Sequence, residues 1–181
     1  MDREKAIKAV EDLLKALGED VMREGLKDTP RRVADAFAEF VSGEGQDAGE
    51  HLSKTFTGAG GELVIEKDIA FSSTCEHHLM PFFGKIAIAY IPDGKVVGLS
   101  KLARTVEVFS KRLQLQERLT AQIAEEIMRC LAPKGVMVVC EAEHTCMTCR
   151  GVKKSGSATM SYSIAGNFPE DKKREVLALI K

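Results

Sequence analysis

The sequence predicts an α+β protein in which helices cover an antiparallel four-stranded sheet. Its periodic segments follow the order helix, helix, strand, strand, helix, helix, strand, strand, helix, so the strands come in consecutive pairs. Such pairs favour antiparallel hairpins, because a parallel connection needs a crossover between the two strands. The length of 181 residues fits one domain with a core of its own. We therefore expect a single domain over residues 1–181.

The first part of the chain, residues 1–43, is predicted to be an N-terminal helix pair. Residues 3–17 carry apolar side chains at helical spacing. Thr29 and Pro30 are a capping residue and a proline at the first helical position, which together start a second helix. The segment 43–61 is rich in glycine and lacks periodicity, so we expect a loop there.

The predicted core, residues 62–168, contains four strands and two helices, and residues 169–181 form a short charged C-terminal helix. The outer strands of such a sheet keep an exposed edge, so we expect other subunits to continue the sheet. The expected strands are 62–71, 84–91, 136–143 and 158–165, and the expected helices are 100–113 and 116–131.

The composition argues against several classes of function. The formal net charge is −1, which favours neither nucleic acid nor an acidic membrane surface as a partner. The longest apolar runs are far too short to span a bilayer, and the chain opens with charged residues instead of a signal peptide. We therefore expect a cytoplasmic protein whose five cysteines are reduced and serve ligation or redox chemistry.

The densest group of reactive side chains is Cys75-Glu76-His77-His78, which holds two of the four histidines of the chain. Thiolate sulfur and neutral imidazole nitrogen are ligands that Zn²⁺ prefers. In an extended chain Cys75 shares a face with His77, whereas in a turn it shares one with His78. The predicted end of the strand before Cys75 and the nearby Pro81 favour the turn. We therefore expect Cys75 and His78 to be zinc ligands.

A second candidate pair, His144-x-Cys146, follows the third predicted strand. On a strand this spacing places both side chains on one face, so both can reach one site. Four protein ligands, His144 included, would make a closed structural zinc site, whereas three would leave a position for water, as in catalytic sites. Cys146-x-x-Cys149 offers a rival redox pair, although no βαβ pattern surrounds it. Spacing alone does not decide between these alternatives.

Cationic side chains flank the candidate ligands. Ser100, Lys101 and Arg104 lie at the start of a predicted helix, where a helix N-terminus with nearby cations suits phosphate. Arg150 follows the second group of candidate ligands directly. In a protein of nearly neutral net charge, these clusters suggest a local site for an anionic ligand. Glu117 begins another helix, a position that the helix dipole favours for any carboxylate.

Four sequence blocks, which occur in the family's order, together resemble the GTP cyclohydrolase I family. The similarity runs from about the first helix to Phe168. The resemblance implies the tunnelling fold (T-fold), in which the sheets of several subunits join into a barrel, and a homodecamer of two stacked rings with active sites at subunit interfaces. The blocks are Ser73-Thr74-Cys75-Glu76-His77-His78, Gly98-Leu99-Ser100-Lys101-Leu102-Ala103-Arg104, Gln116-Glu117-Arg118-Leu119-Thr120 and His144-x-Cys146-x-x-x-Arg150-Gly151.

The resemblance also implies roles for individual residues. Zinc would be held by Cys75, His78 and Cys146, with the fourth position left to water. His144 would transfer protons with help from His77, and Ser100 would act with them in catalysis. The substrate GTP would meet Glu117, Gln116 and the Leu99 backbone at its guanine edge, and Ser100, Lys101, Arg104, Arg150 and Arg32 at its ribose and triphosphate.

The implied reaction is zinc-dependent hydrolysis and ring rearrangement of GTP. Water at the zinc attacks C8 of guanine, formate leaves, and the opened ribose recloses onto the ring nitrogens. The product would be 7,8-dihydroneopterin triphosphate, made in the first step of tetrahydrofolate and pterin biosynthesis. One rival hypothesis is a non-enzymatic assembly module with a closed zinc site. Another is a T-fold relative acting on a different pterin or a deazapurine, against which the Cys-Glu-His-His block and Glu117 argue.

Overall fold

The computed structural model of the protein describes residues 1–58 and 61–181. These residues group into two compact units, Met1–Ser42 and Gly43–Lys181. The first unit is the predicted helix pair, and the second contains the predicted core and the C-terminal helix. A single domain over the whole chain stays a prediction.

The N-terminal unit consists of α1 (Arg3–Ala16) and α2 (Thr29–Phe40). The carboxylate of Asp2 caps α1, because it accepts a hydrogen bond from the backbone N–H of Lys5, one of the groups without an intrahelical partner. The guanidinium of Arg3 in α1 pairs with Asp35 in α2 at 2.7 Å. The helix pair is therefore confirmed, and the two helices begin at the predicted residues, Arg3 and Thr29.

The C-terminal unit is built on a five-stranded sheet and three longer helices. Its main elements are β2 (Val64–Cys75), β3 (Pro81–Ile91), α4 (Leu99–Ser110), β5 (Leu113–Gln114), α5 (Gln116–Leu131), β6 (Gly135–His144), β7 (Thr159–Gly166) and α7 (Glu170–Leu179). The strand order is β5-β2-β3-β6-β7. Strands β2, β3, β6 and β7 pair antiparallel, which confirms the predicted α+β class and its four-stranded sheet. The short β5 adds a parallel pairing at the end of β2.

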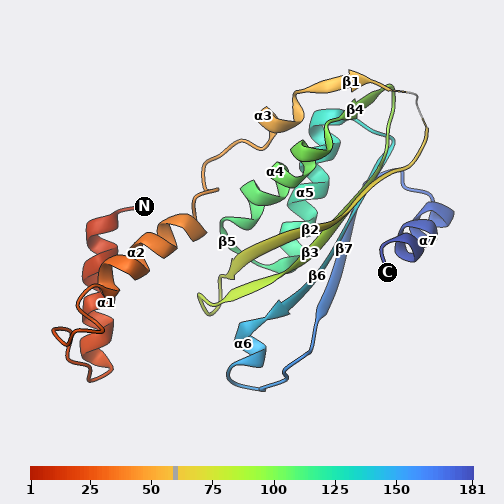
Figure 1. The fold of residues 1–181 in the computed structure, drawn as a ribbon. Helices are drawn as coiled ribbons and strands as arrows, with labels where there is room; N and C mark the ends of the chain where they lie inside the picture. The colour runs from red at the N-terminus through yellow and green to blue at the C-terminus, as the bar shows by residue number, and fades with distance from the viewer. Residues whose placement is uncertain (59–60) are drawn as a thin grey trace. The chain divides into compact units, whose positions relative to one another are not determined.

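Both faces of the central strands are buried. Ile86 and Ile88 of β3 pack into the main core cluster, which contains apolar side chains of α4 and α5. The alternate residues Ala87 and Ala89 belong to a second cluster with Val176 of α7. This alternation follows from the pleat, which points successive side chains to opposite faces. Helices α4 and α5 therefore cover one face of the sheet and α7 the other (Figure 1).

Besides the short strand β5, four further short elements were not predicted. They are α3 (Gly49–Leu52), β1 (Thr55–Thr57), β4 (Lys95–Val97) and α6 (Thr145–Thr148). Strands β1 and β4 form a two-stranded antiparallel sheet. The expected loop over 43–61 is therefore wrong where α3 and β1 lie. Elements of three or four residues are too short to show a hydrophobic period, so their formation depends on tertiary pairing.

Two boundaries differ from prediction at the candidate ligands. Strand β2 runs on to Cys75 instead of ending at Phe71, because residues 72–74 pair with the start of β3 and residues 74–75 pair with β5. Strand β6 ends at His144, and Cys146 lies in the helical turn α6. The predicted strand geometry for the His144-x-Cys146 pair is therefore wrong, because a turn of helix follows the first of the two residues.

Candidate active site

A tight turn after β2 brings Cys75 and His78 together. The backbone N–H of Leu79 donates to the carbonyl of Cys75 at 2.8 Å, and the N–H of Cys75 donates to the carbonyl of Met80 at 2.9 Å. Leu79 takes the left-handed conformation, with φ of 54°, which residues other than glycine adopt infrequently. Cys75 Sγ and His78 Nδ1 lie 3.8 Å apart. The residues that a turn was expected to bring together are therefore adjacent.

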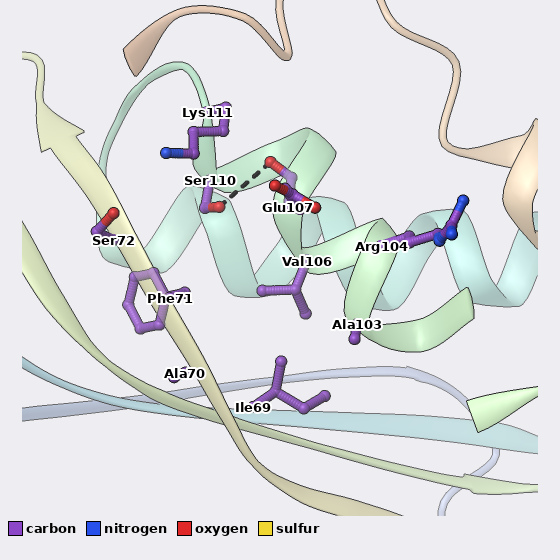
Figure 2. A pocket seen from close by; sticks show the side chains of 10 residues that line it. All are labelled: Ile69, Ala70, Phe71, Ser72, Ala103, Arg104, Val106, Glu107, Ser110 and Lys111. Carbon is purple, nitrogen blue, oxygen red and sulfur yellow. Dashed lines mark hydrogen bonds between the residues drawn. The ribbon is translucent and has the colours of Figure 1, made fainter. Parts of the chain in front are cut away.

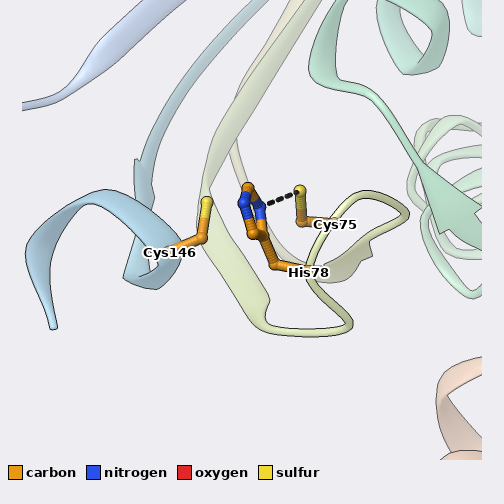
Figure 3. Close-up of side chains that lie close together, drawn as sticks. All are labelled: Cys75, His78 and Cys146. Atoms are coloured by element: carbon orange, nitrogen blue, oxygen red, sulfur yellow. Dashed lines mark hydrogen bonds between the residues drawn. The ribbon is translucent and has the colours of Figure 1, made fainter. Parts of the chain in front are cut away.

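Cys146 of α6 completes a group of three metal-ligand side chains. Its sulfur, the sulfur of Cys75 and a ring nitrogen of His78 all lie within 4.8 Å of one another, and the imidazole of His78 stands between the two cysteines in Figure 3. Within the described residues this is the one such group of His, Cys, Asp or Glu side chains. Cys75 is buried and His78 is exposed, so the cluster opens to solvent on the histidine side. Burial raises the pKa of the Cys146 thiol, and the neighbouring Cys75 raises it further.

Glu76, in the turn between the first two of these residues, is bound to α5 by Arg118. The Nη1 of Arg118 donates to Glu76 Oε2 at 2.6 Å and its Nη2 donates to Oε1 at 2.8 Å, which makes a bidentate pair. This hydrogen bonding holds the pKa of the Glu76 carboxyl below its ordinary value. The backbone N–H of Glu76 also donates to the carbonyl of Gln114 in β5 at 3.1 Å. Two separate attachments therefore position the turn.

His144 ends β6, two residues before Cys146, and does not belong to the three-residue cluster. Its ring stacks on that of Phe82, with centroids 4.7 Å apart and an interplanar angle of 2°. Its Nε2 lies 2.8 Å from Oε1 of Gln116. Burial lowers the pKa of His144, and the charge of Glu117 opposes this effect in part. The ring is therefore mainly neutral at pH 7, where a histidine serves proton transfer well.

Helix α5 begins with two of the predicted substrate residues. The side chain of Gln116 is only 2% exposed and is hydrogen-bonded within the chain, so a contact with substrate would fall to its backbone N–H. The first N–H groups of a helix have no intrahelical acceptor and are available for such contacts. Glu117 is exposed, and its charge acts on the neighbouring His144. The structure therefore places the Glu117 carboxylate near the candidate proton-transfer group.

The predicted residues of α4 lie elsewhere on the sheet. Leu99, Ser100 and Lys101 form the first turn of α4, whereas its last turn leads into β5, which pairs with Cys75. The helix has 12 residues, so its two ends are about 18 Å apart. Arg104 lines a hollow of about 450 Å³ between α4 and the middle of β2 (Figure 2). Within one chain, the first turn of α4 is therefore remote from the cysteine–histidine cluster.

The remaining predicted residues occupy three different settings. His77 is exposed, and its ring centroid lies 6.2 Å from that of His78. Arg150 is exposed just after α6, where its charge partly offsets the raised pKa of Cys146. Arg32 belongs to the N-terminal unit, where its guanidinium lies 3.4 Å from the carboxylate of Asp28. The roles expected of these residues stay predictions.

Two residues that contact the site had no assigned role. Arg118 lies inside one of the motif blocks, but nothing in its spacing links it to Glu76. Phe82 follows Pro81 in β3, and the antiparallel register of β3 with β6 sets it opposite His144. A model of strand pairing would have revealed Phe82, whereas the contact of Arg118 requires the packing of α5 against the turn.

The fold and the cluster define the class of protein: an α+β protein with a candidate transition-metal centre and a half-buried histidine two residues from one of its ligands. A family model described as GTP cyclohydrolase I matches residues 6–181. The chain therefore belongs to the GTP cyclohydrolase I family, as its motif blocks predicted, and GTP cyclohydrolase activity goes with that membership.

Similar proteins agree over nearly the full length. The chain is 56% identical to GTP cyclohydrolase 1 of Clostridium perfringens, with 99% of this chain and 98% of that protein covered. It is 58% identical to GTP cyclohydrolase 1 of Clostridium kluyveri, covering 93% and 91%. Among solved structures, the archaeosine synthase QueF-Like in the apo form matches with a TM-score of 0.49 and 20% identity, over 61% of this chain and 100% of that chain. The family assignment rests on the sequence matches.

Proposed function

We propose that this protein converts GTP to 7,8-dihydroneopterin triphosphate and formate with the help of Zn²⁺, in the first step of tetrahydrofolate and pterin biosynthesis. The observation that carries the proposal is the Cys75–His78–Cys146 cluster beside a neutral His144, in a chain of the GTP cyclohydrolase I family.

The side chains of the cluster fit zinc. Zinc–sulfur bonds of about 2.3 Å and zinc–nitrogen bonds of about 2.0–2.1 Å in a tetrahedral site set neighbouring ligand atoms roughly 3.5–3.8 Å apart. The 3.8 Å between Cys75 Sγ and His78 Nδ1 agrees with this spacing. Thiolates and imidazole also select zinc over the oxygen-preferring cations. When bound by three protein ligands, zinc supplies a position for water and lowers the pKa of that water to about 7.

His144 would move protons at the guanine ring, and His77 would assist from the exposed side of the turn. His144 suits this role because its ring is neutral, half-buried and held in one plane by Phe82. Glu117 would accept hydrogen bonds from adjacent N–H groups of guanine, since a carboxylate has two acceptor oxygens. The backbone N–H of Gln116 and the backbone of Leu99 would complete the guanine contacts.

The triphosphate and ribose would be bound by Ser100, which would also act in catalysis, together with Lys101, Arg104, Arg150 and Arg32. The first turn of α4 is about 18 Å from the end of that helix nearest the cluster, which supports a site shared between subunits. One chain would supply the cluster, and a neighbour would supply the residues of α4. In this arrangement the cationic side chains of α4 would bind the triphosphate of a GTP molecule held at the cluster of a neighbouring chain.

The assembly would be a homodecamer of two stacked rings in which sheets join into the T-fold barrel. Strand β7 pairs with β6 alone, and β5 covers only the last two residues of β2, so both edges of the described sheet can accept another strand. No helix in the described residues is long and apolar enough to cross a membrane. We also propose a cytoplasmic location, because the thiolates of the cluster must stay reduced to bind metal.

Incubation of the zinc-loaded protein with GTP tests the proposal. We expect stoichiometric formate together with a pterin that becomes fluorescent after oxidation, and we expect a chelator to abolish both products. GTP consumption without formate would assign the protein to another reaction. A zinc-loaded protein that leaves GTP unchanged would favour the structural alternative for the metal site.

A further inference from the structure

The amide of Gln116 is held in one orientation by its surroundings. Its Nε2 lies 3.1 Å from the carbonyl oxygen of Cys140, 2.9 Å from that of Thr159 and 3.1 Å from the hydroxyl of Ser161. A carbonyl oxygen only accepts hydrogen bonds, so the atom that faces two of them must be the NH₂ group. Rotating the amide would set its oxygen against two carbonyl oxygens, Cys140 and Thr159, with no hydrogen between them, at a site that is 2% exposed.

The remaining atom of that amide, Oε1, lies 2.8 Å from Nε2 of His144. An amide oxygen cannot donate, so the hydrogen between these two atoms belongs to the histidine. In the neutral ring the Nε2 atom is then protonated, and Nδ1 carries the lone pair. Stacking on Phe82 sets the plane of the ring, whereas the bond to Gln116 sets which nitrogen holds the hydrogen.

We propose that Gln116 is a positioning residue that fixes His144 as the Nε2–H tautomer, so that Nδ1 is the atom that accepts and returns protons in the reaction. This inference rests on the proposed role of His144 in proton transfer. It gives the Gln116 side chain a function separate from direct contact with guanine. The anchor is strong because the carbonyl groups come from β6 and β7, and the amide crosses from α5 to both strands.

The two possible roles of Gln116 predict different kinetics. A side chain that binds guanine directly would mainly raise the KM for GTP when it is removed. A residue that orients a proton-transfer group would mainly lower kcat, because ground-state binding does not need the correct tautomer. We expect Gln116→Met to lower kcat about 10–100-fold, the range typical of losing a partner that orients a histidine, with KM changed less than threefold or so.

Magic-angle-spinning NMR of zinc-loaded protein with ¹⁵N-labelled histidine tests the tautomer directly. The nitrogen resonances distinguish an N–H nitrogen from one that carries a lone pair, and His144→Asn assigns the signals among the four histidines. We expect the wild-type protein to show only Nε2–H at His144, and Gln116→Met to show a second population with Nδ1–H. A wild-type ring with Nδ1–H would overturn the proposal even if the variant failed to fold. An unchanged spectrum in a folded variant would overturn it as well.

Gln114→Met is the matched control. Gln114 is another buried glutamine, 1% exposed, whose NH₂ group donates to the Phe109 carbonyl and to Gln122. The substitution is chemically the same as Gln116→Met, but Gln114 does not contact His144. We therefore expect the histidine spectrum of the Gln114→Met protein to match that of the wild type. If His144→Ala proves fully active while the tautomer is fixed as described, the proposed function of His144 is wrong and the hydrogen-bond assignment stands.

Discussion

The ring of Phe82 lies flat against the ring of His144, with 4.7 Å between the ring centroids and 2° between the ring planes. Phe82 is fully buried and also makes an edge-to-face contact with Phe71, at 5.8 Å and 76°. The candidate proton-transfer group is thus supported by the core of the sheet. Movement of the ring out of its plane would have to displace a buried phenylalanine, which close packing resists.

Replacing Phe82 with leucine should therefore affect stability and turnover together. We expect the free energy of unfolding to fall by about 1–2 kcal/mol, less than the roughly 3–5 kcal/mol typical of Phe→Ala in a core. We also expect kcat to fall, because the ring of His144 loses its flat support. Denaturant unfolding and formate release measure the two effects. Phe83→Leu is the control: Phe83 is 44% exposed, so a change within about 0.5 kcal/mol is expected.

Substitutions of the cluster should separate metal binding from proton transfer. We expect Cys75→Ser and Cys146→Ser to lose zinc and activity together, since each removes a thiolate ligand. His144→Ala should lose activity and retain zinc, because His144 is bonded to Gln116 instead of joining the cluster. Elemental analysis and formate release on the same samples provide the comparison. A His144→Ala protein without zinc would mean that the site is closed by four protein ligands.

Glu117→Gln should weaken the use of GTP without disturbing zinc. A charge-assisted hydrogen bond is worth about 1.5–3 kcal/mol, so its loss should raise KM by roughly tenfold or more. Steady-state kinetics and metal content check this expectation. Glu125→Gln provides the control, because Glu125 is an exposed carboxylate of the same helix. Equal KM values for the two variants would remove Glu117 from the guanine site.

Arg118→Met should loosen the turn that carries Cys75 and His78. The bidentate pair between Arg118 and Glu76 ties that turn to α5, and we expect zinc affinity to fall about tenfold, at the low end for residues that orient ligands. Competition with a coloured chelator measures the affinity. Lys85→Met breaks an exposed ion pair with Asp68, of 2.8 Å, elsewhere in the same sheet. If both variants lost zinc affinity to a similar extent, the effect would be due to surface charge and not to the turn.

The Glu126–Arg129 pair of α5 should contribute stability only above acidic pH. The hydrogen bond from Arg129 lowers the pKa of the Glu126 carboxyl below its ordinary value of 4.5. The unfolded chain then binds the proton first as pH falls, so the contribution is present above about pH 4.5 and is lost as pH drops toward the lowered pKa. Unfolding of wild type and Glu126→Gln at about pH 6 and about pH 3.5 should show a larger difference in stability at the higher pH. A stability difference of equal size at the two pH values would contradict this expectation.

The longer elements followed from local pattern. Sequence pattern predicted the helices α1 and α5 and the strands β3 and β6. A hydrophobic period that extends over eight or more residues is compatible with few alternative secondary structures. The motif blocks likewise indicate the family from the sequence alone. The helical turn α6 was not predictable, and with it the geometry of Cys146, because four residues carry no period. The end of β2 lies at Cys75 because its last residues pair with two partners that local pattern did not predict: the first residues of β3, and β5, a strand of two residues.

Features formed by residues that are close in sequence can be predicted from the sequence. Here they include the ligand types of the cluster and the turn that joins Cys75 to His78. The surroundings of His144 depend instead on segments far apart in sequence. Phe82 reaches it through the register of β3 with β6, and Gln116 reaches it because α5 packs across β6 and β7. Long-range packing selects these partners. The spacing of residues in the sequence does not predict which buried donor will bond to which acceptor. Tertiary structure therefore decides how the histidine is held and which of its nitrogens carries the hydrogen.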